Sequence, residues 1–231
     1  MKTPFLAAFL AAVAAGALQA ADEKDTAKVE KRLADAGTAF TEIMAAQDKN
    51  IPGSILDKAD CVVVIPGMVK GGFIVGGQVG KGAVSCRSAD KSMWGAPAMI
   101  EMGGGSVGFQ IGASETDVVM LVMNRKGMNS LLKDKFTLGG DASVAAGPVG
   151  RATTAETDAA LHAEILSYSR SRGAFAGIAL KGSTLKQDNE ANEALYGKRM
   201  EASAILSGTT AVPPSAAPLL NALKMYSPIG K

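Results

Sequence analysis

A glycine-rich decapeptide that occurs twice is the feature that most constrains how this chain folds. The first copy, GGFIVGGQVG, runs from Gly71 to Gly80, and the second, GGGSVGFQIG, runs from Gly103 to Gly112. Both fit the pattern Gly-Gly-x-x-Val-Gly-x-Gln-x-Gly. Glycine weakens a strand because it loses more conformational entropy on folding than other residues and packs no side chain. So many glycines in a strand therefore indicate that another backbone, a helix or a ligand must come close.

Alternation at a period of two residues predicts that each copy is a strand with one apolar face. The apolar faces carry Phe73, Val75 and Val79 in the first copy and Val107, Phe109 and Ile111 in the second. The opposite faces carry Gly72, Gly76 and Gln78, and Gly104, Gly108 and Gln110. Two interpretations stay open for the second set of faces. They pack tightly inside a curved sheet, or they form the wall of a groove for a lipid, lined by Gly76, Gln78, Gly108 and Gln110.

The rest of the chain is helical in pattern at its ends and strand-like in its middle. From Glu23 to Lys49, apolar residues three and four positions apart form one stripe, which consists of Val29, Leu33, Ala36, Phe40 and Ile43. Several strand-like runs broken by glycine follow between Lys70 and Asn124. Short helical patterns return after Asp188. We therefore expect an α+β fold, with a Gly-rich, mainly antiparallel curved sheet or barrel-like core and helices at both ends.

The first twenty residues, MKTPFLAAFLAAVAAGALQA, have the layout of a secretory signal peptide. Lys2 is their only charge, an Ala-rich apolar run follows, and small residues end the segment. The run is shorter than the roughly 20 apolar residues that a spanning helix needs. We expect cleavage after Ala20 and export to the periplasm. The predicted organisation is a signal peptide at 1–20, an amphipathic helix at 21–50 and one domain over 34–227.

The two cysteines, Cys61 and Cys86, both lie in apolar, strand-like contexts. In an oxidising compartment they can pair, and closing that loop would contribute roughly 3 to 4 kcal/mol in the chain-entropy model. Alternatively, they are two separate buried thiols that behave as small hydrophobic residues. The sequence leaves both possibilities open, because it gives no distance between the two Cα atoms.

Composition and motifs argue against several function classes. The chain has 231 residues, a net charge of +2 and one histidine. Such a balanced charge does not favour a nucleic-acid surface, and a single His162 cannot supply a multi-histidine metal site. We expect no metal or other cofactor. Gly103, Gly105 and Gly108 match a dinucleotide fingerprint, but a strand-like pattern follows where that motif needs a helix.

A serine hydrolase remains an alternative on sequence grounds. Gly104-x-Ser106-x-Gly108 matches the nucleophile-elbow string, and His162 lies downstream of it with acidic residues between. The elbow requires a sharp turn from a strand into a helix, whereas Ser106 stands in a strand-like alternation. Several basic residues beside Gly-rich turns instead suit an anionic headgroup. These candidate lipid-binding residues are Lys70, Lys81, Arg87, Arg151, Arg170, Arg172 and Lys181.

The segments GGSVGFQIG, AAGPVGR, YSRSRGAFAGIALKGS and NEALYG together resemble the SYLF-domain family. The stretch from Ile51 to Gly82 and the WGAP element resemble its N-terminal half, so that the likeness runs from about Ala34 to Ser227. The resemblance implies an exported bacterial, non-catalytic, phospholipid-binding domain. For eukaryotic relatives it implies phosphoinositide binding with a basic amphipathic N-terminal helix, and a link to actin in some. The helix here is instead charge-balanced and the chain carries no SH3 or FYVE module.

These observations lead to one main prediction and two alternatives. The main prediction is a non-catalytic protein of the cell envelope that binds anionic phospholipid or a membrane surface. One alternative is a serine hydrolase that uses Ser106 and His162. The other is a structural envelope protein whose glycine faces dock a partner chain.

Overall fold

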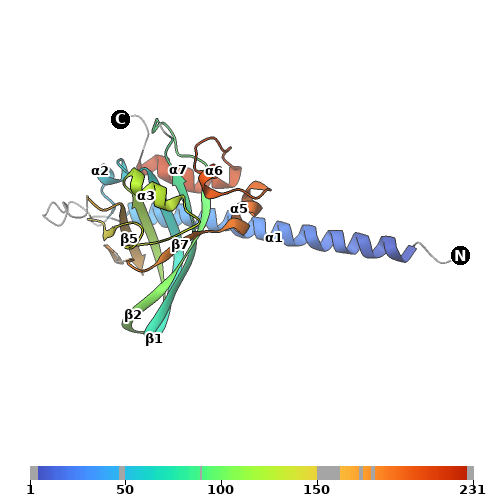
Figure 1. Ribbon diagram of the computed structural model, residues 1–231, viewed down its shortest axis with the longest axis horizontal. Coiled ribbons are helices and arrows are strands. Elements are labelled where there is room, and N and C mark those ends of the chain that lie inside the picture. Colours follow the sequence, from blue (N-terminus) through green and yellow to red (C-terminus); the bar gives the residue numbers. More distant parts are fainter. Residues whose placement is uncertain are drawn as a thin grey trace.

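The computed structural model describes residues 5–46, 50–88, 90–149, 162–171, 174–177 and 180–227. For residues 5–22, 72–75, 106–113 and 174–177 it describes the course of the backbone only. Within this part of the chain, strands of the middle region form one sheet, and helices from both ends of the chain cover it (Figure 1). This arrangement confirms the predicted α+β fold.

The sheet has the strand order β3-β7-β2-β5-β4, with β1 paired to β2 and β6 paired to β5. Its strands are β1 (Cys61–Cys86), β2 (Ala98–Val122), β3 (Lys135–Thr137), β4 (Val144–Ala146), β5 (Ile165–Ser171), β6 (Ala174–Gly177) and β7 (Thr184–Gln187). Neighbouring strands are antiparallel except β4 and β5, which are parallel. The mainly antiparallel sheet that the sequence predicts is therefore confirmed.

The helices are α1 (Phe5–Met44), α2 (Gly53–Leu56), α3 (Arg125–Leu131), α5 (Asn189–Tyr196), α6 (Ala202–Ile205) and α7 (Ala217–Tyr226), with a 3-10 turn η1 (Pro214–Ala216) before α7. The expected apolar stripe of α1 is buried along its whole length, and Phe40 meets the ring of Tyr226 edge-on. α1 starts earlier and ends earlier than the predicted range of 23–49. Side-chain caps begin two others: Asn124 accepts backbone N–H groups of α3, and Asp188 accepts one of α5.

Two long strands replace the several short ones expected between Lys70 and Asn124. β1 and β2 pair from Cys61 with Val122 to Val84 with Ala98, and the pairing continues through most of the glycines, with register shifts between Ile65 and Met68 and between Gly72 and Ile74. The expectation of breaks was wrong because an extended partner strand on one side supplies the hydrogen bonds that hold glycine in β conformation. The two strands form one antiparallel ribbon.

The ribbon doubles back on itself. Cys61 and Cys86, at the two ends of β1, form a disulfide with their Cα atoms 3.9 Å apart, which settles the open question of their pairing. The backbone N–H of Arg87 donates to the carbonyl of Asp60 beside it. The pairing register shifts between Gly72 and Ile74, near the middle of β1. In Figure 1 this middle part extends away from the helices and the rest of the sheet.

We divide the ribbon into two parts. The proximal ribbon comprises residues 61–68 and 80–86 of β1 with their partners 98–102 and 116–122 of β2. The distal ribbon comprises 69–79 and 103–115. In the proximal ribbon alternate residues enter two hydrophobic cores: Val62 and Val64 pack with α1 and α7, whereas Val63 and Ile65 pack with residues of α3, α6 and the short strands.

Along the part of the chain that the structure describes, no helix has the length and apolar character needed to cross a membrane. The same residues contain no group of three or more His, Cys, Asp or Glu side chains placed to hold a metal ion.

Candidate functional site

Lys81, near the second end of β1, lines three neighbouring pockets. The first, of about 550 Å³, lies between α1 and the proximal ribbon. The second, of about 790 Å³, lies over strands β1, β2, β7 and β3 at the base of the distal ribbon. The third, of about 440 Å³, lies between α1 and α5. We call the first the ion-pair pocket and the second the ribbon pocket.

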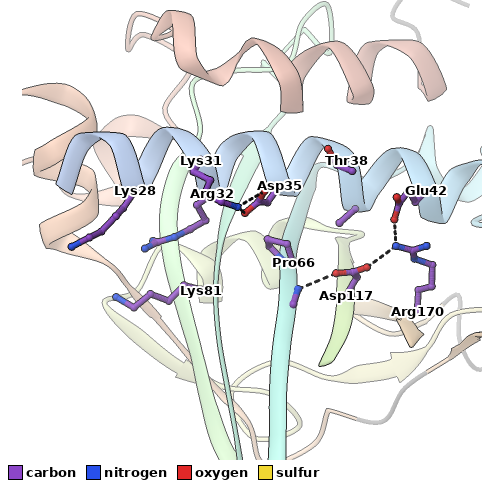
Figure 2. A pocket seen from close by; sticks show the side chains of 12 residues that line it. Lys28, Lys31, Arg32, Asp35, Thr38, Glu42, Pro66, Lys81, Asp117 and Arg170 are labelled. Carbon is purple, nitrogen blue, oxygen red and sulfur yellow. Dashed lines mark hydrogen bonds and ion pairs between the residues drawn. The ribbon is translucent and has the colours of Figure 1, made fainter. Parts of the chain in front are cut away.

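Charged side chains of α1, β1, β2 and β5 surround the ion-pair pocket (Figure 2). Lys28, Arg32 and Lys81 extend toward one end of it, and Arg170 lies at the other end between Glu42 and Asp117. Each of its cations has an acidic partner. Lys28 pairs with Asp25, Lys31 with Asp35, and both Arg32 and Lys81 with Asp188. The pairs of Glu42 with Arg170 and of Arg32 with Asp188 join α1 to β5 and to the start of α5. Little unpaired positive charge is left in this pocket for a ligand.

Asp188 is the buried centre of this network, with 7% of its side chain exposed. Its carboxylate accepts from Lys81 Nζ at 3.0 Å, from Arg32 Nη1 at 2.9 Å and from the backbone N–H of Ala191. Burial works to raise the pKa of Asp188, but these donors outweigh burial and hold the pKa below its ordinary value. Asp188 thus stays charged and ties α1, α5 and β1 together.

The ribbon pocket is built on one face of four neighbouring strands. Because cross-strand partners share a face, the register places two rows of side chains there. The first row, across β1, β2, β7 and β3, is Lys81, Glu101, Lys186 and Lys135. The second row is Val79, Gly103, Thr184 and Thr137. A charged row with three lysines and one glutamate therefore borders an uncharged row.

Glu101 occupies the gap between two of these lysines. Lys81 Nζ lies 3.5 Å from its carboxylate, and Lys186 also pairs with it. Lys135 is exposed and has no ion-pair partner among the residues that the structure describes. The pocket edge consequently has a surplus of positive charge, with Lys135 available for an anion.

The uncharged part of the ribbon pocket is open and apolar. Val79 is 63% exposed and Val69, which enters from the other leg of the ribbon, is 40% exposed. A Cβ built on Gly103 meets nothing within 4 Å, so this glycine leaves space where a side chain would lie. The result is an apolar hollow beside a lysine row, which suits a molecule with an anionic head and an apolar body.

The candidate lipid-binding residues predicted from the sequence do not converge on one site. Lys81 lines the ribbon pocket, and Lys81 with Arg170 lines the ion-pair pocket. Lys70 is half-buried on β1, where burial lowers its pKa, and Lys181 is exposed beside Gly139. Arg151 and Arg172 lie outside the described residues.

Arg87 makes contacts within the fold and does not line the ribbon pocket. Its guanidinium lies 4.2 Å from the centroid of the Trp94 ring, and it donates to the carbonyl of Ala59 and to the hydroxyl of Ser227. These contacts tie the loop after β1 to the C-terminal end of α7.

The predicted groove residues all lie in β1 and β2. Gln78 is buried, with 6% exposed, and donates to the hydroxyl of Ser183. Its neighbour Val79 is the residue that faces the pocket. Gly76 pairs with Ser106 and Gly108 pairs with Ile74 in the distal ribbon. Gln110 lies in β2 near the register shift, and its side chain is outside the described part.

The serine hydrolase alternative lacks its required turn. Ser106 lies inside β2 and pairs with Gly76, so no strand-to-helix elbow is formed at this position. His162 is exposed in a turn before β5.

Sequence reasoning missed Lys135, Lys186 and Glu101, which the register brings next to Lys81. The segments KFT and TLKQ are only three and four residues long. A period-two pattern cannot be recognised in such short runs. The sequence therefore does not indicate that these two segments are strands or that their lysines lie beside Lys81.

Comparison with known proteins identifies the family. Residues 103–226 match the family model Ysc84, described as a Las17-binding protein actin regulator. The chain belongs to this Ysc84 (SYLF) family. This confirms the resemblance drawn from the sequence motifs.

Curated relatives extend the match toward the N-terminus. The chain is 36% identical over 180 residues to Protein YSC84 of Saccharomyces cerevisiae, which is 77% of this chain and 38% of that protein. It is 36% identical over 180 residues to LAS seventeen-binding protein 3 of the same yeast, covering 77% and 39%. It is 35% identical over 191 residues to SH3 domain-containing YSC84-like protein 1 of Mus musculus, covering 81% and 56%. The chain therefore spans well under two thirds of the length of these relatives.

Proposed function

We propose that this SYLF-family chain is a non-catalytic binding protein that holds an anionic phospholipid at the ribbon pocket and thereby attaches to a membrane surface. The observation that carries the proposal is the pair of rows across β1, β2, β7 and β3. One row offers Lys135 to a phosphate, beside Lys81 and Lys186, which share Glu101 as a partner. The other row leaves an apolar hollow beside Val79 and Gly103.

The chemistry of the two rows matches the two parts of a phospholipid. A lysine near an anionic membrane surface contributes about 1 kcal/mol to binding, and exposed valines add burial of apolar area. The pocket volume of about 790 Å³ is within the range of small-molecule sites. The ion-pair pocket is the poorer candidate, because acidic side chains already neutralise its cations.

The proposal also places the protein outside the cytoplasm, in the cell envelope. The layout of residues 1–20 supports export, and the Cys61–Cys86 disulfide is typical of proteins in oxidising compartments. Intact-mass measurement of protein recovered from the periplasm tests this placement. Loss of residues 1–20 is the expected result, and a full-length cytoplasmic product would contradict it.

The family description favours a second candidate, a protein partner, since it calls its members Las17-binding. For this chain a partner would be a protein that docks on the glycine-rich strands. Crosslinking in cells separates the two candidates. Lipid without protein in the crosslinked product supports the first, and a defined protein adduct at the ribbon supports the second.

Vesicle flotation tests the lipid proposal. The mature protein is mixed with phosphatidylcholine vesicles that contain or lack phosphatidylglycerol, and we expect flotation to depend on the anionic lipid and to weaken with salt. Lys135→Ser should weaken binding about fivefold, the equivalent of about 1 kcal/mol. Lys224→Ser, which removes an exposed lysine on α7, is the matched control and should bind as the unaltered protein does. Absence of flotation with both kinds of vesicle would overturn the proposal.

A further inference from the structure

The distal ribbon projects from the fold as two strands without a third. On the far side of β2 from β1, β7 pairs with residues 100–103 and β5 pairs with residues 117–122. Between these two stretches, no other described strand pairs with β2. Figure 1 shows the middle parts of β1 and β2, beside their labels, extending away from the helices. A two-stranded ribbon is marginally stable in water by itself. A partner that covers this ribbon would therefore stabilise it.

The projecting part is free of charge in its sequence. No charged residue occurs from Gly71 to Gly80 or from Met102 to Ser114. The large apolar residues in these two stretches are Phe73, Ile74, Val75, Val79, Met102, Val107, Phe109 and Ile111. Exposed strands normally carry charges, because an uncharged apolar edge promotes aggregation. The absence of charge from these two stretches suits contact with an apolar medium.

Charges appear again at the base of the projecting part. Lys70, Lys81, Lys135 and Lys186 lie on or beside the strands at that level. Three carboxylates, Glu101, Glu115 and Asp188, lie there too; Glu101 is paired with Lys81 and Lys186, and Asp188 with Lys81. An uncharged end above a base with surplus lysine matches the cross-section of an anionic membrane, where phosphates lie outside the acyl chains.

We propose that the turning point of the distal ribbon, around residues 72–75 and 107–111, inserts into the membrane interface. The inference deepens the proposed lipid-binding function and rests on it. The ribbon pocket would then lie at headgroup level, with its lysines on lipid phosphates. The partner that surrounds the turning point is the boundary between headgroups and acyl chains of an anionic lipid layer.

The backbone limits the depth of insertion. β1 and β2 satisfy half of their N–H and C=O groups across the ribbon, for example between Val75 and Val107. The groups on the two outer edges have no partner there among the described strands and cannot enter the hydrocarbon centre without a large cost. Insertion therefore stops in the interface, about 5–10 Å deep, which corresponds to roughly three residues of strand.

Depth-dependent fluorescence tests this arrangement. A cysteine is introduced by Gln110→Cys, opposite the register shift, and labelled with nitrobenzoxadiazole in the otherwise unchanged chain. Met93→Cys, in the exposed loop after β1 at the other end of the ribbon, is the matched control. Both proteins are mixed with phosphatidylcholine–phosphatidylglycerol vesicles that carry brominated acyl chains, and flotation is measured on the same samples.

The expected result is a blue shift and quenching by bromine for the label at position 110 and neither for the label at position 93. Flotation with no quenching at position 110 would overturn the insertion while the lipid-binding function stands. Failure of both labelled proteins to float would overturn the function and the insertion together. A blue shift at position 110 in the absence of vesicles would show burial against a second copy or a protein, and would also overturn the insertion.

A substitution gives an independent measurement. Phe73→Asp combined with Phe109→Asp should reduce flotation at least tenfold, because two charges would enter the interface. Val212→Asp places a charge at another exposed valine and should float as the unaltered protein does. Equal flotation of the double variant and the control, with both folded by circular dichroism, would count against insertion.

Discussion

The proximal and distal parts of the ribbon are made from the same two strands, but Gly82 in the proximal part and Gly103 in the distal part serve different purposes. In the proximal part, a Cβ on Gly82 would lie 2.0 Å from the carbonyl oxygen of Val64, since the two legs of β1 pack directly against each other. In the distal part, a Cβ on Gly103 would meet nothing within 4 Å. One glycine allows two backbones to touch, and the other keeps a hollow empty.

The comparison separates two explanations of a glycine-rich strand that the sequence cannot separate. Packing requires Gly82 because the neighbouring atoms are backbone and cannot move aside. No neighbouring atom requires a glycine at position 103, and the space that Gly103 leaves is open to a ligand. Glycines that have free space around them and no positive φ, as Gly103 does, are therefore the better guides to function. The following predictions test this contrast, from the largest expected effect to the smallest.

Gly82→Ala should have the largest effect. The added methyl group would overlap the Val64 carbonyl, and separating the two legs would disturb both cores. We expect a loss of about 4 kcal/mol or more in the free energy of unfolding, measured by urea denaturation. An unfolding midpoint equal to that of the unaltered protein would show that the legs are not in contact.

Removal of the disulfide should have the second-largest effect on stability. Replacing Cys61 and Cys86 together by alanine releases the two ends of β1 and should cost about 3 kcal/mol in the chain-entropy model. Thermal melts of the double variant, and of the unaltered protein with and without reductant, measure this. The double variant should be insensitive to reductant. If reduction leaves the melting temperature of the unaltered protein unchanged, the bridge does not constrain the ribbon.

Asp188→Asn should destabilise the protein by about 2 kcal/mol. This is less than for a fully buried pair, because Lys81 is half-exposed. The folded protein holds the pKa of Asp188 below its ordinary value. Its stabilising contribution is therefore complete above about pH 4 and is lost as the pH falls through the lower folded value. Urea unfolding from pH 7 downward should show the stability difference between the unaltered protein and the Asp188→Asn variant shrinking in that acidic window.

Gly103→Ala is the matched counterpart of Gly82→Ala and should have the smallest effect on folding. We expect a gain of about 0.5 kcal/mol, because alanine loses less backbone entropy than glycine in a strand. The same urea experiment measures it. The larger Gly103→Val should keep the fold and weaken vesicle flotation by filling the hollow. A destabilisation of Gly103→Ala close to that of Gly82→Ala would remove the contrast between the two parts.

Much of the fold was predictable because it depends on local periodicity. The buried stripe of α1 from Val29 to Ile43 follows from helical spacing, and the strands follow from alternation and β-branched runs. The continuity of β1 and β2 was not predictable from glycine content. Whether a glycine breaks a strand depends on the partner strand that holds it, and local sequence does not specify that partner.

The candidate site was predictable only in part. Lys81 was identified because it stands beside a Gly-rich turn. Lys135 and Lys186 reach it only through the register of β2 with β7 and of β7 with β3, which joins residues more than fifty positions apart. Arg87 and Arg170 looked equivalent to Lys81 in sequence, but Trp94 and the acidic partners of Arg170 give them other roles.

The bridge between Cys61 and Cys86 makes the whole of β1 a covalent ring, with the projecting turn as its farthest point. A protease that cuts the chain once between Cys61 and Cys86 would leave two pieces that stay linked through sulfur. The two pieces of such a cut protein would separate only after reduction.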